Sequence, residues 1–267
     1  MGGDEAAGGG TRPARCGTRT HRGGALFAPH DPAAVVAAPY SPPGEVGLLG
    51  TDTLGRDVLS RVLSGGTGLV LISLVAAVIA TAAGVVGGLV TGWWRGRASR
   101  VLASSADVML AVPQLLIALV VAVAVPGPAA VVIATVCGGA PLTLRVTADA
   151  TRALSGSGFV EAARGLGERG PTLLVRELLP SLSGLVTADL GMRFVMAIQL
   201  ASALSLLGFG AAPPEADWAL MIHENLPGSG LNAASVLVPA AALAVTAAGA
   251  AATAAYLGHR TGTRERA

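Results

Sequence analysis

The chain has 267 residues, of which 52% are hydrophobic and only 13% are charged, and its mean hydropathy is +0.64. In soluble domains about a quarter of all residues are charged, so this composition indicates a chain embedded in a membrane. The net charge of +2 is too small to favour a nucleic-acid partner, and all 18 basic residues are arginine. Without lysine neither a phosphate-binding P-loop nor a pyridoxal Schiff base can form, so we expect no ATP hydrolysis and no cofactor.

Charge-free apolar runs long enough to cross a bilayer predict five membrane-spanning helices and an all-α membrane protein. The first run covers residues 69–93. The region between Asp107 and Arg145 has no charge and is too long for one span, so the turn at residues 126–128 divides it into two helices. The fourth and fifth runs cover residues 185–207 and 233–257. These runs show no period-two alternation, which excludes a β-barrel.

The arginines orient these helices. They lie between the first and second spans, around the long loop between the third and fourth, and after the fifth, whereas the loop at residues 210–232 carries three acidic residues and no arginine. The positive-inside rule therefore predicts that the arginine-rich loops and the C-terminus are cytoplasmic. Trp93 and Trp94, at the end of the first span, are typical of an interfacial aromatic belt.

The predicted orientation divides the chain into three parts. Residues 1–27 are rich in glycine and arginine and are typical of a disordered tail. Residues 28–67, which include the string GTDTLGRD, form an extracytoplasmic segment. Residues 68–267 form the transmembrane domain, with a cytoplasmic loop at about 151–183. Five spans with a cytoplasmic C-terminus place this tail on the extracytoplasmic side, and its arginines contradict that placement under the positive-inside rule.

The cytoplasmic loop predicts two short helices. Ser157 can cap a helix that starts near Phe159, and Gly167 can end it in the left-handed conformation. Pro171 suits the first turn of the second helix, which Pro180 helps to stop.

The first of these helices presents a distinctive surface. Glu161 and Arg164 are three residues apart, where they can pair, and Ala162 and Ala163 give the helix a smooth face. Within this loop Glu161-Ala162-Ala163, Gly167 and Leu179-Pro180 resemble the signature loop of binding-protein-dependent ABC importer permeases.

Further segments resemble the C-type permease subunit of the dipeptide/oligopeptide/nickel group within that family. They are LGTDTLGRDVLSR at residues 49–61, LLGFG at 206–210, and Pro213-Pro214 followed by Trp218 and Met221. The resemblance implies a type I ABC importer permease bundle that moves peptides or nickel across the cytoplasmic membrane.

The resemblance also implies partners and docking residues. Two ATP-binding subunits, a second permease subunit and an extracytoplasmic substrate-binding protein would complete the importer, with membrane lipid around it. The ATPase-docking residues would be Glu161, Ala162, Ala163, Arg164 and Gly167. The family has a further span before the segment that begins near Ala28, so we hypothesise that the first span is lost through a misplaced start, a frame change or a truncation.

Two sets of residues inside the spans are functional candidates. Asp189 and Arg193, one helical turn apart, and Gln199 are candidates for the translocation pathway, since ionisable residues within a span are usually functional. The alternative is that Asp189 and Arg193 only neutralise each other. Gly84, Gly88 and Gly92 form a small-residue face that packs against another span or the second permease subunit.

The histidines and cysteines have no metal-ligand spacing, so no metal site is predicted. Two alternative functions stay open. One is a secondary transporter that works without an ATPase, which would need buried coupling-ion residues and broken helices. The other is a truncated remnant that does not transport.

Overall fold

The computed structural model describes residues 28–94, 96–211 and 213–264. The tail at residues 1–27, and with it the place where the hypothetical lost span would end, lies outside these residues. All regular secondary structure in the described residues is helical, apart from the isolated bridges Val35–Arg56 and Thr51–Asp57, and the segment before α1 is made of turns and irregular backbone. Its helices are α1 Val58–Trp93, α2 Arg97–Leu110, α3 Gln114–Ala124, α4 Pro128–Ser155, α5 Gly158–Gly165, α6 Gly170–Leu173, the π-helical turn η1 Leu174–Leu178, α7 Leu179–Ser181, α8 Ser183–Leu206, α9 Trp218–Asn225, the 3-10 turn η2 Leu226–Gly228 and α10 Ala234–Arg264.

The all-α membrane architecture is confirmed. In the described chain four helices are long and apolar enough to cross a membrane, namely α1, α4, α8 and the part of α10 up to Tyr256. The pair α2 and α3 makes a fifth span if it is counted as one, although the two helices are bent by 91°. The turn at residues 126–128 joins α3 to α4, and Gly127 supplies a positive φ of 96° there.

The bend between α2 and α3 is a departure from the straight helix predicted for this region. Its cause is Pro113, which has no N–H to donate and which disfavours helical backbone at Val112 before it. The helix therefore ends at Leu110, and a new one begins at Gln114. Hydropathy did not reveal this break because Val112 and Pro113 lie within an uninterrupted uncharged run.

The first span also begins earlier than predicted. Asp57 caps α1 by accepting a hydrogen bond from the N–H of Ser60 (3.1 Å), so the last residues of the predicted extracytoplasmic segment are helical. At about 1.5 Å per residue α1 is roughly 54 Å long, much more than the roughly 30 Å of hydrocarbon in a bilayer. Part of α1 therefore extends beyond the hydrocarbon core.

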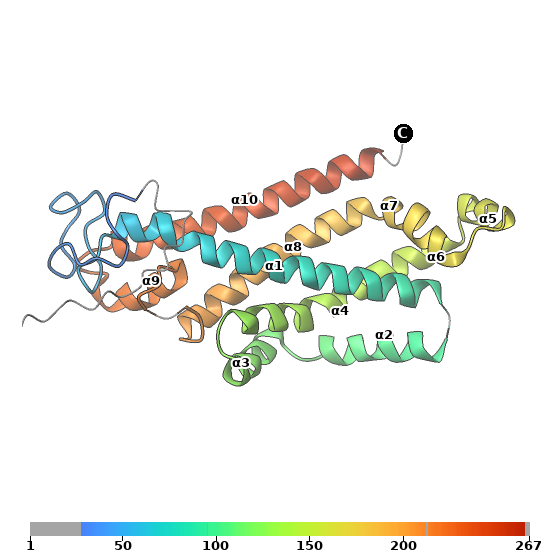
Figure 1. The fold of residues 1–267 in the computed structure, drawn as a ribbon, viewed down its shortest axis with the longest axis horizontal. Coiled ribbons are helices and arrows are strands. Elements are labelled where there is room, and N and C mark those ends of the chain that lie inside the picture. The colour runs from blue at the N-terminus through green and yellow to red at the C-terminus, as the bar shows by residue number, and fades with distance from the viewer. Residues whose placement is uncertain (1–27, 95, 212, 265–267) are drawn as a thin grey trace, which may run out of the picture.

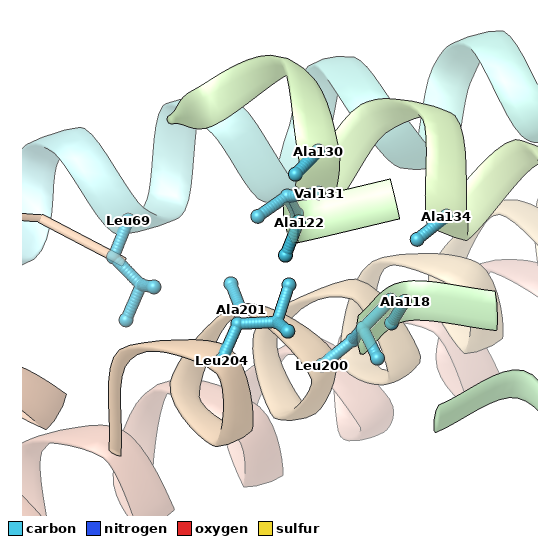
Figure 2. Packing of buried hydrophobic residues seen from close by; sticks show 9 residues of the cluster. All are labelled: Leu69, Ala118, Ala122, Ala130, Val131, Ala134, Leu200, Ala201 and Leu204. Carbon is cyan, nitrogen blue, oxygen red and sulfur yellow. The ribbon is translucent and has the colours of Figure 1, made fainter. Parts of the chain in front are cut away.

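The long helices lie side by side along the longest axis of the molecule (Figure 1). The segment before α1 lies at one end together with α9, and α5 lies at the other. Between these ends, a core of alanine, leucine and valine joins four elements: Leu69 from α1, Ala118 and Ala122 from α3, Ala130, Val131 and Ala134 from α4, and Leu200, Ala201 and Leu204 from α8 (Figure 2). The many alanines allow the helices to approach closely.

The most extensive helix pairing is between α1 and α4. Gly84, Gly88 and Gly92 of α1 face Thr143, Thr147 and Thr151 of α4 in register. A Cβ added at Gly88 would lie 2.5 Å from Cβ of Thr147 and 2.7 Å from the carbonyl oxygen of Leu144. We call this contact the glycine–threonine seam. Its partner is therefore another span of the same chain, one of the two alternatives that the sequence left open.

The seam makes a direct prediction for stability. Gly88→Ala should lower the free energy of unfolding by about 1–3 kcal/mol, because the added methyl group has no room between two helix backbones. Gly68→Ala is the matched control, since it lies in the same helix with nothing within 4 Å of the added Cβ. Thermal unfolding in detergent measures both, and equal melting temperatures for the two variants would contradict the close approach.

Candidate functional site

Helix α5 matches the predicted loop helix: it begins directly after Ser157, the expected cap, and one residue before the predicted start near Phe159. Ser157 has the extended backbone of an N-cap, and its carbonyl oxygen accepts from the N–H groups of Val160 and Glu161. Its side chain does not make the expected cap bond. The hydroxyl donates instead to the carbonyl oxygen of Leu154 at 2.5 Å, at the end of α4. Ser157 therefore fixes the connection between α4 and α5.

The end of α5 is fixed by Gly167, whose φ of +87° is left-handed as expected. The N–H of Glu168 donates to the carbonyl of Ala163, and the N–H of Gly167 to that of Arg164. These two bonds form a Schellman motif, which satisfies carbonyl groups at the helix end. The helix is thus eight residues long, with a defined start and stop.

The surface of α5 divides into an exposed face and a buried base. Glu161, Ala162 and Arg164 are exposed, and Ala163 is half-buried. Val160 is fully buried in a cluster with Val85, Leu89, Leu174, Leu178 and Leu182. The expected pair between Glu161 and Arg164 is absent, because the Arg164 guanidinium lies over the ring of Trp93, 4.4 Å from its centroid. This leaves Glu161 on the open face.

The second part of the loop differs from the prediction. Pro171 does lie in the first turn of α6, but Pro180 does not stop the helical path. The N–H of Leu179 bonds to the carbonyl of Leu174, five residues earlier, in the π-helical turn η1. This wider turn accommodates Pro180, which has no N–H to donate to the preceding turn. The break comes at Leu182, after which α8 begins at Ser183.

Asp189 and Arg193 lie inside the bundle and are paired, with Nε of Arg193 3.3 Å from Oδ1 of Asp189. The other carboxylate oxygen of Asp189 accepts from the hydroxyls of Thr81 (3.0 Å) and Thr143 (2.8 Å). Asp189 thereby joins α8 to both helices of the glycine–threonine seam. Gly139 of α4 leaves the space into which Arg193 extends, since a Cβ there would lie 3.2 Å from its Cδ.

Gln199 is not part of this group. It lies six residues after Arg193, which is about 240° around the helix, and its side chain is exposed. The structure thus brings together two of the three predicted pathway residues, and their contacts account for both charges.

A second set of buried charges lies at the end of the molecule opposite α5. Asp52 and Glu224 together hold two buried arginines, with contacts of 2.7 and 3.0 Å from Asp52 to Arg56 and Arg61, and of 2.9 and 3.2 Å from Glu224 to the same pair. The Arg61 side chain is 0% exposed. Burial raises the pKa of Glu224, although the Arg56 guanidinium favours its charged form. This four-charge cluster fastens the segment before α1 to α9.

The sequence did not reveal this cluster, although it singled out the string that supplies three of the four charges. Two glycines of the string shape its backbone: a Cβ would lie 2.2 Å from the carbonyl oxygen of Ser41 at Gly50, and 2.1 Å from that of Ala37 at Gly55. Both have positive φ. The available signal was that the string carries two arginines, whereas the outer loop carries three acidic residues and no arginine.

Two further side chains shape the outer loop, and one of them attaches it to α1. Nε1 of Trp218 donates to the carbonyl oxygen of Val62 at 2.7 Å, and its ring occupies the space that Gly66 leaves. Asp217 caps α9 by accepting from the N–H groups of Ala219 and Leu220. Burial raises the pKa of Asp217, while those two N–H groups favour its charged form.

The comparisons with known proteins agree with this architecture. Residues 84–262 match the family described as binding-protein-dependent transport system inner membrane component. The glutathione transport system permease protein GsiD of Pectobacterium atrosepticum is 34% identical over 183 residues, covering 68% of this chain and 61% of that protein. GsiD of Shigella flexneri serotype 5b is 36% identical over 184 residues, covering 66% and 58%. The match thus spans about three fifths of the length of these relatives.

A solved structure is similar in fold. A chain from an inward-facing conformation of the MetNI methionine ABC transporter superposes with a TM-score of 0.61 at 14% identity, covering 75% of this chain and 96% of that one. Together these findings define a multi-pass inner-membrane component of a transport system. The chain belongs to the family of binding-protein-dependent transport system inner membrane components.

The geometry at Gly167 predicts a local effect. Gly167→Ala should destabilise the end of α5 by about 1–2 kcal/mol, because its φ of +87° is unfavourable for any residue with a Cβ. Gly165→Ala is the control, since Gly165 is helical and, like Gly167, has nothing within 4 Å of an added Cβ. Amide hydrogen exchange of α5 reports the difference, and equal protection in both variants would exclude a role for the left-handed turn.

The contacts of Asp189 predict which second substitution restores stability after its carboxylate is removed. Asp189→Asn should destabilise the fold by about 3–5 kcal/mol, because Arg193, whose side chain is 4% exposed, would keep a buried charge without its partner. The double variant Asp189→Asn with Arg193→Met should recover stability and transport together. Thermal unfolding and transport assays are compared, and recovery of stability without transport would show that the pair serves the pathway.

Proposed function

We propose that the chain is the permease subunit of an ABC importer that moves a short peptide or nickel across the cytoplasmic membrane, driven by ATPase subunits on separate chains. The observation that carries this proposal is α5, a separately capped helix at one end of the bundle with Glu161, Ala162 and Arg164 exposed. Small side chains on an exposed helix let a partner surface approach its backbone closely.

The end that carries α5 is the cytoplasmic one in this proposal. The C-terminal end of α1 and the start of α2 lie toward that end (Figure 1), and Arg97 and Arg100 belong to α2. The four-charge cluster and α9 lie at the opposite, extracytoplasmic end. This orientation follows the positive-inside rule and also makes the C-terminus cytoplasmic.

Partners are assigned to the two ends accordingly. Two ATP-binding subunits would receive the loop helices of this chain and of a second permease subunit. An extracytoplasmic substrate-binding protein would deliver substrate at the end formed by the segment before α1 and by α9. Family membership supports this assembly, since the family is described as a component of binding-protein-dependent transport systems.

The relatives favour a peptide as the substrate. Both GsiD proteins are named for glutathione transport, and glutathione is a tripeptide. We therefore place short peptides first and nickel second. Uptake of labelled glutathione, a labelled dipeptide and nickel by the complete importer separates these substrates.

The docking role of α5 predicts the effect of a bulky charge on its smooth face. Ala162→Glu should weaken the association with the ATPase subunits by about tenfold or more, because a charged side chain would be buried without a partner. Ala98→Glu, on exposed surface in the first turn of α2, is the control. Co-purification in detergent measures both.

Two outcomes would contradict the proposal. One is equal ATPase recovery by Ala162→Glu and the wild type. The other is substrate transport by the reconstituted chain in the absence of any ATPase, which would favour a secondary transporter.

A further inference from the structure

Helix α5 is connected to the bundle through two long helices. It follows α4 in the chain, across the short connection at residues 156–157. It also contacts α1, because the guanidinium of Arg164 lies over the ring of Trp93, the last residue of that helix, at 4.4 Å from the ring centroid. This distance is within the range of a cation–π interaction.

The second half of the loop also packs against Trp93. A Cβ added at Gly170 would lie 2.9 Å from Nε1 of Trp93 and 3.4 Å from Cε2, so only glycine leaves room for the ring there. Trp93 also packs against the buried cluster that contains Val160 of α5 and Leu174 of η1. One indole ring is therefore in contact with the parts of the loop before and after the turn at Gly167.

The neighbouring residue shows that this contact is specific to Trp93. Trp94 follows directly in the sequence, has extended backbone and is 45% exposed. Both tryptophans were expected in an interfacial aromatic belt. The structure separates them, because Trp93 is half-buried and packs against that cluster, whereas Trp94 is exposed and is not among the residues packed there.

We propose that Trp93 is a positioning residue that transmits movement of the docking helix to α1. The inference rests on the proposed function, since it concerns how α5 acts once an ATPase subunit is bound. The connection from α4 is only residues 156–157 and is held by the Ser157 hydroxyl, which donates to the carbonyl oxygen of Leu154. Trp93 adds a second attachment, so that α5 moves with both helices.

The glycine–threonine seam couples the two helices to which α5 is attached. The helices α1 and α4 are packed in register through Gly84, Gly88 and Gly92. A movement of α5 that displaces the C-terminal ends of both helices therefore moves them as one unit. Loss of Trp93 should leave the exposed face of α5 intact but allow the helix to move with α4 without displacing α1. A change at Trp93 can therefore distinguish binding of the ATPase subunit from coupling of ATP hydrolysis to transport.

The test uses the complete importer in proteoliposomes, with ATPase affinity and substrate moved per ATP hydrolysed as the two measurements. Trp93→Leu should leave the affinity within about twofold and lower the transport ratio by about threefold or more, because the cation–π contact is lost. Trp93→Phe keeps an aromatic face and should retain most of the ratio. Trp94→Leu is the matched control and should behave as the wild type.

A double-variant comparison tests whether Arg164 acts through the same contact. Arg164→Gln should lower the transport ratio, and its combination with Trp93→Leu should be no worse than the poorer single variant. Arg100→Gln controls for loss of a cytoplasmic positive charge, since Arg100 is exposed on α2. Additive losses would show that the two residues act separately and would overturn the proposed contact.

Other results would also overturn the proposal without touching the proposed function. One is a transport ratio for Trp93→Leu equal to that of Trp94→Leu, and another is a loss of ATPase affinity at an unchanged ratio. If the wild-type chain binds no ATPase subunit, the proposed function fails instead. Amide hydrogen exchange of α5 in the chain alone then decides the positioning role, which requires faster exchange in Trp93→Leu than in Trp94→Leu.

Discussion

The close approach of α1 and α4 is the constraint on which the rest of the bundle depends. Three glycines spaced by one helical turn remove the side chains that would hold the two backbones apart, and three threonines of α4 occupy the space. In lipid the hydrophobic effect does not drive helices together, so packing of this kind and hydrogen bonds between helices must do so. Both are present at Thr143, which packs on Gly84 and donates to Asp189.

Asp189 extends this constraint to a third helix. A carboxylate inside a span is costly unless its charge and its oxygen atoms have partners, and here Arg193, Thr81 and Thr143 supply them. Because those partners come from α1, α4 and α8, the group fixes the relative rotation of three helices. An apolar interface of the same area would tolerate more sliding, since dispersion contacts have little directional preference.

The two ends of the bundle are built on different physical principles. At the extracytoplasmic end proposed above, four buried charges hold irregular backbone against α1 and α9 through four ion pairs. At the other end α5 is attached by a few apolar contacts, a glycine-containing connection and one aromatic ring. Such an arrangement leaves α5 with a defined structure but few attachments, as the proposed docking role requires.

The sequence by itself determined the membrane class, the helical architecture, the position of α5 and its glycine stop, because hydropathy, arginine bias and left-handed glycine are local properties of the chain. It did not determine the bend at Pro113, the partner of the glycine face, or the contacts of Trp93 and the four-charge cluster. Arg56 and Glu224, or Trp93 and Arg164, are far apart in the chain, and nothing in their local sequence states that they meet. Only the packing of the long helices, which fixes their register and rotation, brings such residues within reach.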